Sequence, residues 1–356
     1  MEYIGKLRER CNCMRKVGII GSFCDRLDGQ TIKTKILYNE LKSKTDWKFY
    51  IVNTQAEGQS RIGLLVKSID MMLKCKDIFI LVSQNGARVY FPMLYYASKL
   101  LGRRVYHDVI GGSPEDYVIN NVKNRKYLNK FAVNWVETEK MVKGLESVGV
   151  HNAEVLPNFK RLRIVDCEKR EFYDQISFCT FSRVMKEKGI EEAISAIETI
   201  NKERKDCKLN LDIYGYIDDG YAERFKNVME HVSEAIQYKG MVPYEQSVEF
   251  IKEYYALLFP TFWFGEGFPG TIVDSFASGV PVIASDWSAN SEIITDGVTG
   301  IIYPNGNAKS LKEAIEWSIE HSELMEEMRK NCLEEAKLYQ PEAHIQHIIE
   351  KVELNR

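Results

Sequence analysis

Residues Trp263 to Pro281 read WFGEGFPGTIVDSFASGVP and form the most informative segment of the chain. It follows a short apolar run, Ala256–Phe259, that is typical of a buried parallel strand. The glycines and the proline between Gly265 and Gly270 disfavour regular secondary structure and let the backbone approach a ligand closely. We expect a helix to begin near Gly270, with free N–H groups that favour a phosphate or another anion. A glycine-rich turn without a ligand accounts for the same residues.

Two acidic residues flank this turn. Glu266 lies on the loop and Asp274, eight residues later, lies on the first turn of the expected helix. Both carboxylates can therefore face one cleft. In the alternative interpretation Asp274 only stabilises the start of the helix.

The rest of the chain repeats the pattern of strand and helix. In the first half we expect strands at Lys16–Gly21, Lys48–Val52, Asp77–Val82, Arg104–Asp108 and Ala132–Val136. In the second half we expect strands at Ser177–Ser182, Leu209–Tyr214, Ala235–Lys239, Ala256–Phe259, Pro281–Ala284 and Gly300–Tyr303. Helical patterns separate them, as in Arg61–Leu73, Ile190–Glu203 and Tyr244–Tyr254. Two such series predict an α/β protein of two doubly wound, Rossmann-like domains.

Length and composition agree with two soluble domains. The chain has 356 residues, of which 45% are hydrophobic and 28% are charged. No apolar run reaches the roughly 20 residues that span a bilayer, and the N-terminus lacks the apolar core of a signal peptide. We therefore expect a cytoplasmic protein. Its eight cysteines are scattered and are expected to be free thiols, with no metal site.

Charge is divided unevenly between the two halves. Residues 1–157 hold 25 Lys and Arg against 16 Asp and Glu, and the remainder holds 23 against 35. The net charges of +9 and −12 suggest that the first half meets an anionic partner: a membrane surface, a phosphorylated lipid or nucleic acid. In Lys123–Phe131, basic residues alternate with aromatic and aliphatic ones, which suits an anionic membrane. A solvated surface without a partner explains these charges equally well.

The segment after Trp263, which continues as SFASGVPVIASDWSANSEIITDGVTGIIY, resembles the signature of family 4 retaining glycosyltransferases with the GT-B fold. That signature has a Glu, seven residues and a second Glu, then Ala, Gly, Pro and Val, and later a Glu before Asp-Gly. The matching residues here are Glu266, Asp274, Ala277, Gly279, Pro281, Val282, Glu292, Asp296, Gly297 and Gly300. Phe181–Gly189 is similar to the Arg…Lys-Gly phosphate clamp of the family, and Asp28–Thr31 to its first glycine-containing loop.

The resemblance implies two domains that face each other across a cleft. The acceptor domain would be residues 1–157, joined by a C-terminal helix at 341–356. The donor domain would be residues 158–340. We expect the chain after Pro341 to cross back onto the first domain.

The resemblance also implies a role for each matched position in the donor domain. Arg183 and Lys188 would neutralise the diphosphate of the donor. Glu266 would bind hydroxyls of the donor sugar as one of two catalytic residues, and Asp274, where the family more often has Glu, would bind the ribose. The backbone around Phe268, Pro269 and Gly270 would hold sugar and phosphate. Tyr238 to Met241, with Tyr238 and Met241 at its ends, would face the nucleobase.

In the first half, His107 closes a predicted strand, and the resemblance makes it the second catalytic residue, near the reacting carbon. Gly29 and Gln30 would bring backbone close to the diphosphate or to the acceptor. Ordinary structural roles are open for all three, as a core histidine and as a loop before a helix.

Taken together, the resemblance predicts a retaining hexosyltransferase that needs no metal ion and no cofactor besides its nucleotide-diphosphate sugar. We favour a UDP-sugar over a GDP-sugar. The expected acceptor is a carbohydrate or lipid-linked intermediate of bacterial surface-polysaccharide synthesis, reached from the inner face of the cell membrane. A GT-B sugar-nucleotide epimerase is the main alternative. A non-enzymatic nucleic-acid-binding protein is another, although the acidic second half leads us to expect no nucleic-acid partner.

Overall fold

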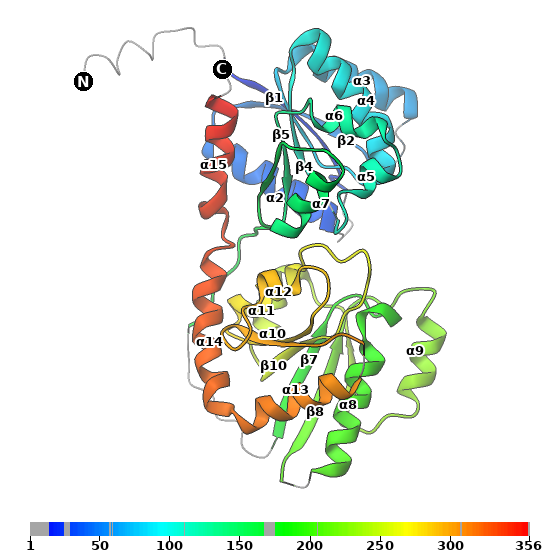
Figure 1. Cartoon of the computed structure of the whole chain (residues 1–356), viewed down its shortest axis with the longest axis vertical. Coiled ribbons are helices and arrows are strands. Elements are labelled where there is room, and N and C mark those ends of the chain that lie inside the picture. The colour runs from blue at the N-terminus through cyan, green and yellow to red at the C-terminus, as the bar shows by residue number, and fades with distance from the viewer. Residues whose placement is uncertain are drawn as a thin grey trace, which may run out of the picture.

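The structure, a computed structural model, describes residues 14–24, 29–56, 58, 60–109, 111–166, 175–204, 206–306 and 308–354. Two six-stranded sheets dominate it, one in each half of the chain (Figure 1). The predicted α/β class with two doubly wound sheets is confirmed.

The first sheet is wholly parallel and has the strand order β2-β1-β3-β4-β5-β6. Its strands are β1 (Lys16–Gly21), β2 (Lys48–Asn53), β3 (Asp77–Ile80), β4 (Arg104–Asp108), β5 (Val133–Val136) and β6 (Ala153–Val155). The central strands are apolar on both faces because helices cover both sides.

Two layers of helices enclose this sheet. One face packs against α2 (Gly29–Lys44) and the C-terminal α15 (Pro341–Leu354). The other face packs against α3 (Arg61–Lys74), α4 (Gln84–Leu101), α6 (Lys123–Leu128) and α7 (Glu139–Ser147), with the short α5 (Asp116–Ile119) beside them. Among the described residues, no helix combines the length and the apolar composition needed to cross a bilayer.

The second sheet is also parallel and has the order β12-β11-β10-β7-β8-β9. Its strands are β7 (Gln175–Phe181), β8 (Lys208–Tyr214), β9 (Ile236–Gly240), β10 (Ala256–Phe259), β11 (Val282–Ser285) and β12 (Gly300–Tyr303). Relabelled by order along the chain, this is the 3-2-1-4-5-6 arrangement, in which the direction of winding reverses between β7 and β10. Ligands of such sheets bind beyond the carboxyl ends of the strands at this switch point.

Helices cover both faces of the second sheet. The helices α8 (Ile190–Glu203), α9 (Ala222–Met229) and α13 (Ala308–Glu320) share one apolar core with it. The helices α10 (Ser247–Ile251), α11 (Gly270–Ala277), α12 (Asn290–Ile293) and α14 (Ser322–Lys337) share the other. The chain then runs from α14 to α15 alongside both halves (Figure 1).

Most predicted elements have close counterparts, and two differ. The predicted helix Tyr244–Tyr254 is replaced by a 3-10 turn, η2 (Tyr244–Gln246), and the five-residue α10. The strand β6 was not predicted, because three residues are too few to display a strand periodicity.

The helix α15 seals the face of the first sheet that α2 leaves open. Its buried side chains Ile345, Ile348 and Val352 share a core with Leu37 and Leu41 of α2. The helix at the end of the chain therefore completes the core at its beginning.

We expect the substitution Ile348→Ala to lower the free energy of unfolding by about 2 to 5 kcal/mol, because it leaves a cavity at a fully buried position. Urea denaturation monitored by circular dichroism measures the loss. Glu353→Ala, an exposed position on the same helix, is the control and should change stability by less than about 0.5 kcal/mol. Equal effects of the two substitutions would contradict this packing role.

Candidate functional site

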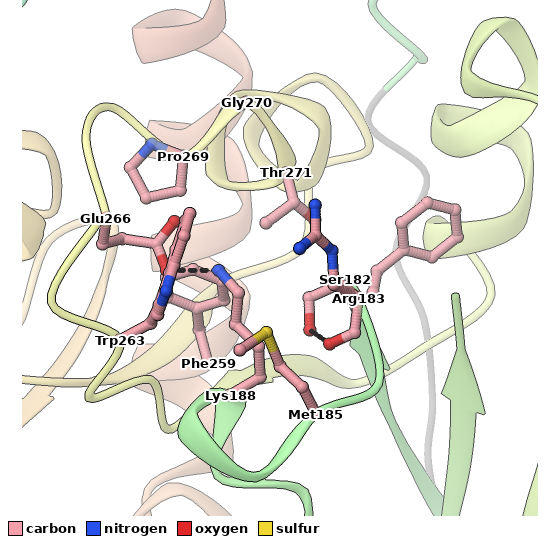
Figure 2. Close-up of a pocket in the computed structure, with 11 residues that line it drawn as sticks. Ser182, Arg183, Met185, Lys188, Phe259, Trp263, Glu266, Pro269, Gly270 and Thr271 are labelled. Atoms are coloured by element: carbon pink, nitrogen blue, oxygen red, sulfur yellow. Dashed lines mark hydrogen bonds and ion pairs between the residues drawn. The ribbon is translucent and has the colours of Figure 1, made fainter. Parts of the chain in front are cut away.

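A pocket of about 220 Å³ opens at the switch point of the second sheet (Figure 2). Its walls come from the segments that follow β7 and β10 and from the start of α11. The lining residues are Phe181, Ser182, Arg183, Met185, Lys188, Phe259, Trp263, Glu266, Pro269, Gly270 and Thr271. The structure thus brings five residues predicted from sequence together in one place: Arg183, Lys188, Glu266, Pro269 and Gly270.

Lys188 and Glu266 form an ion pair on the floor of this pocket (Figure 2). The same carboxylate oxygen of Glu266 accepts a hydrogen bond from Thr261 Oγ1 at 2.9 Å. The Lys188 ammonium also lies 4.8 Å from the ring centre of Trp263, a cation–π distance. Burial lowers the pKa of Lys188, while Glu266 opposes this shift. The ion pair therefore holds a cation in place inside an otherwise desolvated pocket.

Arg183 supplies a second cation, in a more open position. Its side chain is half exposed, and its nearest acid is Asp218, 3.9 Å away. In Figure 2 its guanidinium group extends toward Thr271 at the start of α11. Arg183, Lys188 and the first N–H groups of α11 therefore bring positive charge to one pocket.

The loop from Trp263 to Gly270 is held by contacts with both halves of the chain. The Phe268 ring is buried and lies 5.4 Å, centre to centre, from Tyr339. The Phe268 N–H donates to Glu137 Oε2 at 3.1 Å. A Cβ on Gly112 would lie only 2.0 Å from the Glu266 carbonyl oxygen, so the two backbones meet at a distance that only glycine allows.

Glu137 belongs to a buried cluster of charges beneath this contact. Lys33 Nζ lies 2.7 Å from Asp108 Oδ1 and 2.9 Å from Glu137 Oε1, and it donates to the Val109 carbonyl at 3.2 Å. Burial alone would lower the pKa of Lys33, but the two carboxylates outweigh it and the pKa is raised. Burial raises the pKa of Asp108 to about 6, against the opposing charge of Lys33. Lys33 pairs with Oε1 of Glu137, and Oε2 of Glu137 accepts the hydrogen bond from the Phe268 N–H.

Asp274 lies on α11 as predicted, but it is buried and paired with Lys160. Burial raises the pKa of Asp274, and Lys160 opposes the shift. Asp274 is not among the residues that line the pocket. Its predicted contact with a ribose would have to share the carboxylate with Lys160, a partner that the sequence did not indicate.

His107 ends β4 and is completely buried among the rings of Phe91, Tyr117 and Phe131. Its Nδ1 lies 3.0 Å from Asn134 Oδ1. Because the Asn134 amide nitrogen already donates elsewhere, this oxygen must accept and Nδ1 carries the proton. Nε2 has no hydrogen-bond partner among the described residues. His107 does not line the pocket, so its contact with a sugar stays a prediction.

Gly29 and Gln30 form the first turn of α2, and Asp28 before them lies outside the described residues. The Gln30 side chain donates from Nε2 to the Leu81 carbonyl at 3.1 Å, across the switch point of the first sheet. The Gln30 side chain therefore holds α2 against the end of β3. A contact of Gln30 with a ligand would have to come from its backbone.

Tyr238 and Met241 flank the end of β9. The Tyr238 hydroxyl donates to the Gly215 carbonyl at 2.8 Å, and its ring packs against Phe225. Met241 is 68% exposed. Neither residue lines the pocket, and their role toward a base stays a prediction.

Several residues at the site were missed by sequence reasoning. Met185 and Thr271 line the pocket, Lys33 and Glu137 support the loop, and Lys160 pairs with Asp274. Met185 and Thr271 lie inside motifs already singled out and could have been inferred from them. The others are far from their partners in sequence, so no local pattern marks them. Within the described residues, no group of three or more His, Cys, Asp or Glu is arranged to hold a metal ion.

A family model matches the half of the chain that contains this pocket. Residues 167–336 match the family model described as glycosyl transferases group 1. This segment belongs to the group 1 glycosyl transferases. It contains the pocket, the Lys188–Glu266 pair and Asp274.

Curated relatives match parts of this chain at low identity. An uncharacterised glycosyltransferase of Methanocaldococcus jannaschii is 25% identical over 248 residues, which cover 68% of this chain and 58% of the archaeal protein. The capsular polysaccharide biosynthesis glycosyltransferase CapM of Staphylococcus aureus is 28% identical over 158 residues, covering 42% of this chain and 38% of CapM. The chain therefore matches less than two thirds of the length of either relative.

A solved structure matches nearly the whole chain in fold. HepE of Anabaena in complex with UDP superposes with a TM-score of 0.74 at 14% identity, covering 96% of this chain and 100% of HepE. HepE in complex with UDP-glucose gives a TM-score of 0.70 at 13% identity, with coverages of 95% and 99%. The predicted GT-B fold is confirmed.

We expect His107 to make stability depend on pH. Burial lowers the pKa of His107 to about 4, so the folded state keeps the imidazole neutral while the unfolded chain protonates it below about pH 6.5. The stability that depends on the neutral imidazole is fully present above about pH 6.5 and is lost as the pH falls toward 4. Between about pH 7 and pH 5 the loss is about 2 kcal/mol.

Urea denaturation of the native chain and of His107→Gln at both pH values measures this difference. The opposite effect of Asp108, whose pKa is raised, is common to both chains and cancels. Parallel pH profiles for the two chains would contradict the buried neutral histidine.

We expect Glu137→Ala to loosen the loop around Phe268. The substitution removes the acceptor of the Phe268 N–H and leaves Lys33 paired with Asp108, so the cluster becomes neutral. A hydrogen bond to a charged group contributes about 1.5 to 3 kcal/mol, which corresponds to amide exchange at least roughly tenfold faster. Hydrogen–deuterium exchange of peptides spanning 263–270 measures it. The control Glu139→Ala lies at the exposed start of α7, and an equal change there, or none at Glu137, would contradict the role.

Proposed function

We propose that the protein is a retaining glycosyltransferase that moves a hexosyl unit from a nucleotide-diphosphate sugar to an acceptor hydroxyl. The single observation that carries the proposal is the pocket at the second switch point, where Arg183, Lys188 and the start of α11 bring positive charge together. The group 1 family match covers the same residues.

The chemistry of transfer fits this charge. The bond between sugar and diphosphate breaks with negative charge developing on the leaving diphosphate. Arg183, whose nearest acid among the described residues is Asp218 at 3.9 Å, can pair with phosphate oxygens. Lys188 is already held in place by Glu266 and Trp263, so little reorganisation is needed when charge develops. This cationic pair takes the place of a bridging metal ion in the proposal.

Glu266 and the loop after it would bind the sugar. One oxygen of Glu266 is shared by Lys188 and Thr261, and the carboxylate faces the pocket beside Pro269 (Figure 2). Asp274 would bind the ribose in competition with Lys160. His107 would act from beneath the edge of the first sheet, and Gly29 and Gln30 would lie toward the diphosphate or the acceptor.

The acceptor would enter from the first half of the chain. The contact of Glu137 with Phe268 and that of Gly112 with Glu266 bring the carboxyl edge of the first sheet to the loop 263–270, called here the donor loop. An acceptor hydroxyl held there would lie next to the sugar, on the face from which the diphosphate leaves, which gives retention. The relation to CapM favours an acceptor in surface-polysaccharide synthesis. HepE, solved with UDP-glucose, favours a UDP-sugar as donor.

We expect a UDP-sugar to raise the thermal unfolding midpoint of the protein. At a free concentration about a hundredfold above Kd, a ligand stabilises the folded state by about 2.7 kcal/mol. A thermal-shift panel of UDP-, GDP-, ADP- and TDP-sugars identifies the donor. Analysis of the donor incubated alone separates the alternatives, because an epimerase converts it without an acceptor.

Arg183→Ala should weaken binding of that donor by roughly tenfold to a hundredfold, the loss of a charged hydrogen-bonding pair. The unfolding midpoint without ligand should not change, because the side chain is half exposed. Arg204→Ala is the control: Arg204 follows α8 at the opposite edge of the sheet. Donor affinity equal to that of the native chain in Arg183→Ala would refute the phosphate-binding role.

A further inference from the structure

The helix α3 carries an apolar stripe on the side that faces away from the protein. Its exposed members follow the spacing i, i+3, i+4, i+7 and i+11 along one line of the helix. They are Ile62, Leu65, Val66, Ile69 and Leu73. Ile62 is 76% exposed and Leu73 is 58% exposed. The opposite side, with Ser68, Met71 and Met72, is buried against the sheet, so α3 is apolar on both sides, whereas a surface helix ordinarily turns polar residues outward.

The neighbouring helix α4 repeats the feature. Val89, Tyr96 and Leu100 are exposed at i, i+7 and i+11, and Leu100 is 73% exposed. The buried hydroxyls of Ser68 on α3 and Tyr90 on α4 lie 3.5 Å apart, which places the two helices in contact. Figure 1 shows them together on the outer side of the first sheet. The two stripes thus lie on helices that touch each other, and they are called here together the α3–α4 surface.

Basic residues border the α3–α4 surface. α3 carries Arg61, Lys67 and Lys74, α4 carries Arg88 and Lys99, and the adjoining α6 carries Lys123, Arg125 and Lys126. All eight are exposed. These three helices hold one acid, Asp70, which lies 2.7 Å from Lys74. With eight positive charges and one negative, their net charge is +7.

The segment Lys123–Phe131, predicted to face a membrane, supplies charge but not apolar contact. Tyr127, Leu128 and Phe131 are buried in the core beneath it. The exposed apolar side chains come from α3 and α4 instead. The ring of Tyr95 on α4 lies 5.0 Å from that of Tyr127, so α6 adjoins the α3–α4 surface and extends its basic border.

We infer that the α3–α4 surface docks on a bilayer that contains anionic lipids. Free aliphatic side chains surrounded by lysine and arginine match the boundary between acyl chains and negative headgroups. A second copy of the chain is a poorer partner, because two such surfaces would oppose +7 with +7. The inference rests on this surface alone and does not depend on the proposed donor site.

The experiment is flotation of the protein with vesicles of phosphatidylcholine alone and of phosphatidylcholine mixed with phosphatidylglycerol, at low and high salt. We expect binding to the anionic vesicles at about 0.1 M salt, and weaker binding at about 1 M, where charges are screened within about 3 Å. The absence of binding to anionic vesicles at either salt concentration would overturn the inference.

Two variants test which side chains carry binding. Replacing Ile62, Ile69 and Leu73 with Ser should reduce vesicle binding at least about tenfold, since burial of each side chain favours docking. Replacing Val298, Leu324 and Leu338 with Ser, three exposed aliphatic residues of the second half, is the matched control and should leave binding unchanged. A second test, Lys67→Glu with Lys99→Glu, removes charge and keeps the apolar stripe, and it should also reduce binding.

Thermal unfolding verifies that each variant is folded. Undiminished binding of the α3 variant would refute the α3–α4 surface as the docking site. Sedimentation velocity without lipid tests whether a second copy of the chain occupies the surface. If the native chain forms a dimer that the α3 variant abolishes, the surface is a dimer interface and the inference is overturned.

Discussion

The hydrogen bond from the Phe268 N–H to the buried carboxylate of Glu137 joins the two sheets at the edges where their strands end. Glu137 can serve as acceptor because Lys33 holds its other oxygen and Asp108 shares the positive charge. Removing Lys33 would leave two buried carboxylates without a compensating charge. The position of the donor loop therefore depends on a residue near the beginning of the chain.

The meeting of the two sheet edges also explains why glycine is needed in both loops, at Gly112 and at Gly267. Gly112 approaches the Glu266 carbonyl so closely that a side chain would separate the loops, and Gly267 lies against Glu137 and Gly111. With the loop fixed from the first half, Glu266 is free to hold Lys188 in the pocket. The contact of Glu137 with Phe268 thereby supports the ion pair of Lys188 and Glu266, which lies wholly within the second half of the chain.

The two faces of the first sheet are used differently. One is sealed by α2 and α15, so that the end of the chain stabilises its beginning. The other is covered by α3 and α4, whose outer sides are apolar and basic. Both helices start after the carboxyl ends of their strands, at the edge that meets the donor loop. A bilayer on the α3–α4 surface would therefore adjoin the side of the first sheet that meets this loop.

The α/β class, most strand positions and the residues that line one wall of the pocket could be predicted from local sequence patterns. Buried parallel strands are short apolar runs, and Arg183, Lys188 and Glu266 lie in local motifs beside them. The partners of these residues became visible only in the folded chain: Lys160 for Asp274, Glu137 for Phe268, and an aromatic enclosure for His107. In the structure Phe131 is buried, and the exposed apolar residues beside the basic side chains lie on α3 and α4 instead. Local periodicity reports which face of a helix is apolar, but burial and pairing depend on segments that are distant in sequence and meet only when both sheets have formed.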